Sequence, residues 1–105
     1  MQQIVFCTCP DQQTAQALAN RLITERLAAC VNIFPGVTSI YPWQGEVETA
    51  QEYLLLIKTR QEYFNSLAVL IKSLHPYQLP EIVAVNIERG TTEYLQWIDS
   101  CLCHD

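Results

Sequence analysis

Basic residues are scarce in this sequence, which has six Lys and Arg against eleven Asp and Glu and a formal net charge of −5. Nucleic-acid affinity comes largely from clustered Lys and Arg, so this balance argues against a nucleic-acid partner. It also disfavours docking on anionic lipid. An acidic protein is compatible with cation binding, although most acidic proteins bind no specific metal.

Long apolar runs are also missing, and the longest falls far short of a membrane span. The N-terminal residues 1–3 lead directly into an apolar tetrad, without the basic region of a targeting segment. Five scattered cysteines, an odd number, do not resemble a disulfide framework. We therefore expect a cytoplasmic protein with no membrane partner.

The sequence lacks the common catalytic signatures. It contains no Walker loop, no dinucleotide fingerprint and no paired His-x-x-Glu pattern. Cys7 and His75 suit a nucleophile and a base, but no orienting third group or oxyanion loop accompanies them. Acylphosphatase-type hydrolases need an Arg and Asn constellation that cannot be placed here. The sequence therefore predicts a binding protein and no enzyme.

What the sequence does contain is apolar residues, which make up 50% of its 105 positions. This length falls in the single-domain range, and no linker, repeat or low-complexity segment divides the chain, so residues 1–105 are predicted to form one domain.

Apolar spacing and turn residues predict strands, helices and a hairpin tip in this order: strand 4–7, helix after an Asp11 N-cap, strand 29–40 with a bend at Pro35-Gly36, hairpin tip 41–45, strand 46–58, helix 63–74, strand 82–87 and a last helix from Thr91 or Thr92.

This βαββαβ order with an added C-terminal helix predicts an α+β, ferredoxin-like sandwich, in which two helices cover one face of an antiparallel sheet. The strands do not alternate apolar and polar residues as a half-exposed sheet requires. Residues 4–7, 53–57 and 82–85 are apolar on both faces. The face of the sheet that the two helices leave uncovered would therefore be apolar. Since large apolar patches are rare on monomers, we expect this face to be buried in an obligate oligomer.

Several segments in a fixed order resemble a known family. They are residues 25–32 (ERLAACVN), 41–45 (YPWQG), 58–59 (KT), 75–82 (HPYQLPEI) and 94–98 (YLQWI). They resemble the divalent-ion tolerance protein CutA family over nearly the whole length of the chain. The resemblance implies a cytosolic homotrimer of ferredoxin-like subunits with long hairpins that reach the neighbour. It also implies a link to tolerance of copper and other divalent cations.

Cys7 and His75 are the candidate metal ligands. The βαββαβ order allows the first strand and the end of the second helix to approach each other, and thiolate and imidazole suit copper, with thiolate favouring the cuprous state. The resemblance implies a third ligand, a His at the position that Leu74 occupies here, so that ligand is missing. The alternative is that Cys7 is a small buried apolar residue and that His75 lies favourably at a helix C-terminus.

Lys58, Tyr77 and Glu81 are candidates for a ligand cleft between subunits, because charged groups beside buried aromatic rings suit small-molecule pockets. A structural ion pair or hydrogen bond at the interface is the alternative. The hairpin aromatics Tyr41, Trp43 and Tyr53 are predicted to pack between subunits, since aromatic anchors dominate interfaces. A stacking surface for a ligand is the alternative there.

The C-terminal tail carries Cys101, Cys103 and His104, a short Cys-x-Cys-His cluster. Such a cluster suits a soft metal but lacks the paired knuckles of a structural zinc site. The alternative is that Cys101 packs on the last helix while Cys103 and His104 are exposed to solvent.

The sequence and the resemblance together predict a homotrimeric, non-enzymatic protein of divalent-cation tolerance that binds copper or another divalent cation at Cys7 and His75. They name no downstream partner. The competing hypothesis is a trimer similar to the PII signalling proteins, which binds a small effector between its subunits. A purely structural scaffold would bind neither ligand.

Overall fold

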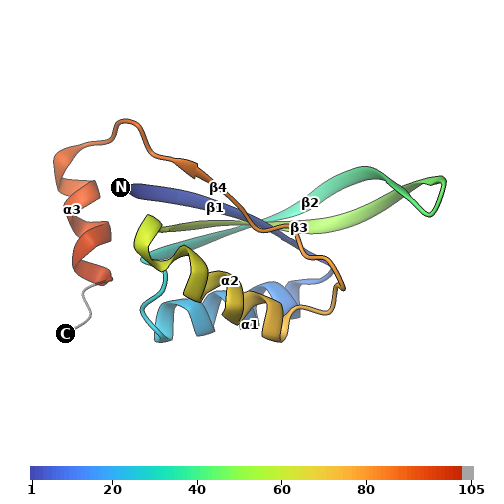
Figure 1. Cartoon of the computed structure of the whole chain (residues 1–105), viewed down its shortest axis with the longest axis horizontal. Helices are drawn as coiled ribbons and strands as arrows, with labels where there is room; N and C mark the ends of the chain where they lie inside the picture. Colours follow the sequence, from blue (N-terminus) through green and yellow to red (C-terminus); the bar gives the residue numbers. More distant parts are fainter. Residues whose placement is uncertain (103–105) are drawn as a thin grey trace.

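The computed structural model describes residues 1–102, which form a four-stranded sheet with helices α1 and α2 packed side by side on one face (Figure 1). The β2–β3 hairpin extends well beyond the helices at one end, and α3 lies at the opposite end. The elements are β1 (Gln2–Cys9), α1 (Gln12–Thr24), β2 (Cys30–Trp43), β3 (Glu46–Arg60), the 3₁₀ turn η1 (Gln61–Tyr63), α2 (Phe64–Leu74), β4 (Val83–Asn86) and α3 (Thr92–Cys101).

The sheet order is β2-β3-β1-β4 and every neighbouring pair is antiparallel, which confirms the predicted ferredoxin-like fold. β1 is central, with Val5 opposite Ile57 of β3 on one side and Ala84 of β4 on the other. β4 pairs with Gln3 to Phe6 only. The second half of β1 therefore has a strand neighbour on one edge alone.

The strands are longer than predicted at the hairpin and at β1. Residues 41–43, predicted to lie in the hairpin tip, belong to β2, and the turn consists of Gln44 and Gly45 alone. Both turn residues have positive φ, 51° and 82°, as a two-residue type I′ turn requires. The predicted break at Pro35-Gly36 is confirmed as a register shift between Phe34 and Val37, with Gly36 at φ 74°.

The helix ends follow their local sequence. The Asp11 carboxylate accepts the Thr14 N–H at 2.7 Å, which confirms the predicted N-cap of α1. α2 ends at Leu74 because His75, which precedes a proline, is extended. α3 begins after Thr91, whose hydroxyl accepts the Tyr94 N–H.

The core lies between the sheet and helices α1 and α2. Its fully buried side chains come from alternate strand positions and from the inward stripe of each helix: Val5, Cys7, Cys9, Ala15, Leu18, Leu22, Leu55, Ile57, Leu67 and Ile71. The register places Ile4, Phe6, Leu54 and Leu56 on the opposite face of the sheet, where neither α1 nor α2 packs. Among residues 1–102, neither α1 nor α2 covers this face, which is apolar as the strand composition predicted.

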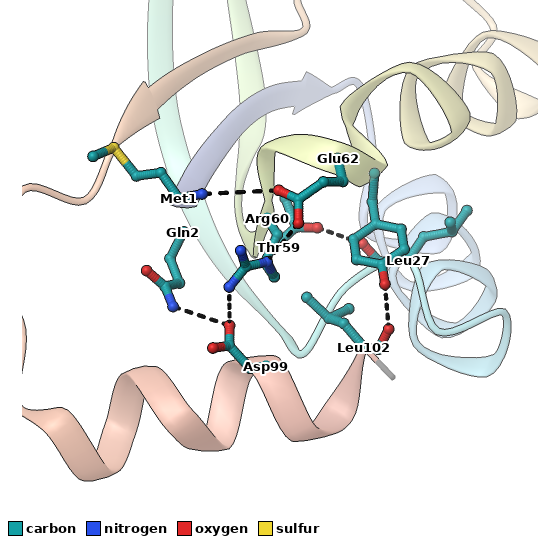
Figure 2. A network of polar contacts seen from close by, with 9 residues as sticks. Met1, Gln2, Leu27, Thr59, Arg60, Glu62, Asp99 and Leu102 are labelled. Carbon is teal, nitrogen blue, oxygen red and sulfur yellow. Dashed lines mark hydrogen bonds and ion pairs between the residues drawn. The ribbon is translucent and has the colours of Figure 1, made fainter. Parts of the chain in front are cut away.

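α3 is attached to the ends of β1 and β3 by a polar network (Figure 2). The Arg60 guanidinium contacts Asp99 at 2.7 Å and Glu62 at 2.9 Å, and the Gln2 amide donates to Asp99 at 2.9 Å. The Tyr63 hydroxyl donates to the carbonyl of Leu102 at 2.6 Å. α3 thus covers one end of the sheet and leaves most of the outer face open. None of the helices within residues 1–102 combines the length and apolar character of a membrane span.

Candidate metal centre

Three potential metal ligands meet at the end of β1. The sulfur atoms of Cys7 and Cys9 and a ring nitrogen of His75 all lie within 4.8 Å of one another. Both thiols are fully buried, and His75 is 8% exposed. The predicted proximity of Cys7 and His75 is therefore confirmed, and Cys9 joins them.

The local structure explains why these side chains meet. Cys7 and Cys9 are two positions apart on β1, so they project from the same face, toward the helices. α2 packs on that face and ends at Leu74. His75, the next residue, therefore lies at the edge of β1 beyond Phe6, the last β1 residue that pairs with β4. There the His75 Nε2 lies 2.8 Å from the carbonyl oxygen of Thr8.

Both ring nitrogens of His75 have hydrogen-bond partners. The backbone N–H of Tyr77 donates to Nδ1 at 3.1 Å, so Nδ1 carries no proton. Nε2 then carries the proton and donates it to the Thr8 carbonyl. The ring is thus a neutral imidazole, the form that binds metals. An ion bound at His75 must displace one of these two backbone partners.

Tyr77 and Glu52 border the cluster. The Tyr77 ring lies 4.7 Å from the His75 ring, and its hydroxyl donates to a Glu52 carboxylate oxygen at 2.7 Å. Glu52 is buried. Burial and this carboxylate together raise the pKa of Tyr77, so the hydroxyl keeps its proton and remains a donor.

The two thiols sit in a negative environment. The pKa of Cys7 is raised by its hydrogen bond with Cys9, by burial and by the negative charges of Cys9, Glu81 and Glu52. The pKa of Cys9 is lowered by the Cys7 thiol, against burial and the nearby acids Asp11 and Glu52. Cys9 is therefore the thiol of the pair that ionises first. Acidic groups beside a thiol pair favour a cation at this position.

The residues predicted for a ligand cleft do not lie together within one chain. Tyr77 borders the cysteine cluster, and the charge of Glu81 raises the pKa of Cys7. Lys58 lies six positions from Glu52 along β3, about 20 Å away at 3.3 Å per residue. Its ammonium lies 5.7 Å from the centre of the Tyr94 ring of α3. A cleft containing all three residues would need a second subunit and stays a prediction.

The predicted interface aromatics divide into two groups. Tyr41 and Trp43 are exposed on the long hairpin, away from the core. Tyr53 is opposite Cys9 and packs against the core of its own chain. The exposed pair suits contact with a neighbouring subunit better than Tyr53 does, and the interface itself stays a prediction.

Leu74 points away from the cluster. It lines a shallow depression on the surface of the helices, together with Gln13, Thr14, Ala17 and Leu18 of α1. Its side chain is 40% exposed. A ligand at this position would therefore need a different course of the chain at the end of α2 to reach the thiols.

Cys9 and Glu52 were not among the sequence-predicted site residues. The Cys7-x-Cys9 spacing on a strand was a sufficient signal for Cys9, because alternate strand positions share a face. Glu52 gave no such signal, since only the fold brings it to Tyr77. Of the C-terminal cluster, Cys101 ends α3 and is half-buried, while Cys103 and His104 lie outside the described residues.

Comparisons with known proteins agree with this architecture. Residues 3–101 match the family described as CutA1 divalent ion tolerance protein. A divalent-cation tolerance protein CutA from Thermus thermophilus is 53% identical over 98 residues, which cover 93% of this chain and 95% of that protein. A solved CutA structure from Xylella fastidiosa superposes with a TM-score of 0.95 at 45% identity, covering 97% of this chain and 98% of that one.

Proposed function

Because the chain belongs to the CutA1 divalent ion tolerance family, we propose that it contributes to tolerance of copper or another divalent cation by binding the ion at Cys7 and His75. The single observation that carries this proposal is the meeting of a buried thiol and a neutral imidazole at the edge of β1. The family is named for tolerance and for no catalytic activity, in keeping with a binding protein.

The chemistry of the cluster supports copper over harder ions. Magnesium and calcium prefer oxygen ligands, whereas sulfur and imidazole nitrogen suit copper and zinc. The acids near Cys7, Glu52 and Glu81, add a negative field that favours positive charge at this position. The same field raises the pKa of Cys7, so an incoming cation must displace the thiol proton.

A homotrimer in the cytoplasm is part of the proposal. The uncovered apolar face of the sheet supports self-association, because such a face is rare on a stable monomer. The long hairpin, with Tyr41 and Trp43 exposed near its tip, supports contact with a neighbouring subunit. A cytoplasmic location agrees with a site that needs reduced thiols.

Effector binding is the second candidate. Tyr77 lies beside the cluster and Glu81 acts on Cys7 through its charge. Lys58 is about 20 Å from Glu52 along β3, so in this candidate it would come from a neighbouring subunit. The observation that favours this candidate is the buried Tyr77–Glu52 hydrogen bond, since such polar groups beside an aromatic ring can orient a small ligand. It requires no metal.

The test is growth of cells that lack the gene and carry either the wild type or a variant, across a series of copper concentrations. We expect Cys7→Ala and His75→Ala to be as sensitive as the deletion, with equal protein levels on immunoblots. Cys30→Ala is the matched control, because Cys30 lies on β2 outside the cluster. Full tolerance in both cluster variants, with sensitivity in Lys58→Ala, would support the effector candidate instead.

A further inference from the structure

We propose that Cys9 is a third metal ligand, and that Cys7, Cys9 and His75 form a three-coordinate site for the cuprous ion. This inference rests on the proposed function, because it takes the same cluster as the metal site. It adds a ligand to that site and names the oxidation state of its ion.

The geometry needs little change to close around an ion. Metal–sulfur and metal–nitrogen bonds of about 2.0–2.3 Å place the three ligand atoms of a planar site about 3.5–4 Å apart. The three ligand atoms lie at most 4.8 Å apart in this structure. A contraction of about 1 Å, within the range of side-chain rotation, therefore brings all three atoms to bonding distance.

The number of ligands distinguishes the cuprous ion from zinc. Structural zinc is almost always bound by four ligands in a tetrahedron. Within residues 1–102, the cluster contains three ligands and no fourth Cys, His or carboxylate. Burial of both thiols leaves little room for water to supply the missing position. Two thiolates and an imidazole in a dry site match the preference of the cuprous ion for soft ligands.

A disulfide is the other chemistry open to two neighbouring thiols, and the strand geometry disfavours it. Residues two apart on an extended strand have Cα atoms about 6.6–6.8 Å apart. This is the upper limit of the range that disulfides span, so closure would distort β1. β1 is the central strand and is paired with β3 along its whole length. The cysteine pair is thus better placed to share an ion than to form a bond.

The hydrogen bonds of His75 hold its ring in place as a ligand. A ligand histidine usually donates its other N–H to a carbonyl, which fixes the ring. The Nε2–H of His75 already donates to the Thr8 carbonyl, and Thr8 lies between the two cysteines. An ion bound at Nδ1 would replace the Tyr77 N–H there, and the Thr8 hydrogen bond would still hold the ring.

The experiment is an anaerobic titration of the reduced full-length protein with cuprous ion, in competition with a chromogenic chelator. All proteins carry Cys103→Ser and His104→Gln, so that the C-terminal cluster contributes neither of these ligands. We expect one ion per chain in this background. Cys9→Ser should weaken binding by about 100-fold or more, beyond the loss seen when groups behind a ligand are changed. Cys30→Ser, a half-buried cysteine outside the cluster, should leave the affinity unchanged.

X-ray absorption at the copper edge provides a second measurement that does not depend on the stability of a variant. The proposal expects a three-coordinate cuprous ion with two sulfur neighbours and one nitrogen neighbour. A single sulfur neighbour, or wild-type affinity in Cys9→Ser, would overturn the role of Cys9 and leave the Cys7–His75 site standing. Tighter binding of zinc in a four-coordinate site would overturn the cuprous assignment. If the parent protein binds neither the cuprous ion nor, in a parallel titration, the cupric ion, the proposed copper function itself is contradicted.

Discussion

The Tyr77 hydroxyl donates to the buried Glu52 carboxylate at 2.7 Å and so ties the loop of residues 75–82 to β3. The same loop begins with His75 and carries Glu81. Both thiols are fully buried, so a movement of this loop, whose Tyr77 ring packs on His75, can change their exposure to solvent. The hydrogen bond therefore bears on access as well as on stability.

Tyr77→Phe should loosen the loop. The variant leaves a buried carboxylate without the hydroxyl donor, which should lower the free energy of unfolding by about 1–2 kcal/mol. We also expect Cys7 and Cys9 to react several-fold faster with a thiol reagent. Tyr63→Phe is the matched control, since it removes a hydroxyl hydrogen bond of similar length far from the cluster. Equal acceleration in both variants would show that general destabilisation, and not the loop, controls access.

Asp99→Asn should weaken the attachment of α3 in a pH-dependent way. Hydrogen bonds from Arg60 lower the pKa of Asp99 below its ordinary value of 3.8. Its contribution to stability is therefore present above that value and is lost as the pH falls through the lower, folded-state pKa. Urea unfolding should show a less stable variant at pH 7 and a difference that shrinks toward pH 3. The exposure of both partners keeps the effect small. A difference that does not change with pH would contradict the ion-pair role.

Val85→Glu should prevent self-association. Val85 is 49% exposed and lies beside Ile4 on the uncovered face of the sheet, where the proposed trimer would bury it. A charge buried there without a partner is costly, so we expect a folded monomer by sedimentation equilibrium. Val69→Glu on the exposed side of α2 is the control and should keep the wild-type mass. A wild-type mass in Val85→Glu would place the interface elsewhere.

Gly36→Ala should destabilise the hairpin through backbone strain alone. Gly36 has φ 74°, and an added Cβ would meet no atom within 4 Å, so crowding plays no part. We expect a loss of about 1–2 kcal/mol in thermal or chemical unfolding. Gly36→Asn should cost less, because asparagine tolerates this region better. Equal losses in the two variants would argue against the bulge conformation.

Local signals in the sequence were enough for most of the fold. Asp11 and Thr91 precede helices as N-caps, Pro76 ends α2, and Gly36 marks the bulge, because each acts through its own backbone or that of a near neighbour. The hairpin turn was predicted to begin three residues too early, at Tyr41, because aromatic residues and a proline on an edge strand resemble a turn.

The candidate site was predicted only in part, because it depends on contacts between distant segments. The βαββαβ order was sufficient to bring Cys7 toward His75. The burial of Glu52 beside Tyr77 follows from how the loop passes the end of β1, which no local pattern encodes. Lys58 was grouped with Tyr77, although Lys58 lies six positions along β3 from Glu52, the hydrogen-bond partner of Tyr77. Distance along a strand is readable from sequence, but the path of a loop is not.

The shortness of β4 has a consequence for solubility. Beyond Phe6, no strand among residues 1–102 pairs with β1 on the β4 side, and an open edge of this kind can recruit a strand from another molecule. The His75 ring donates a hydrogen bond to the Thr8 carbonyl at this edge, so that carbonyl is not available as an acceptor for a recruited strand. The side chain that we propose as a metal ligand therefore also protects this edge of β1 against pairing with a strand of another molecule.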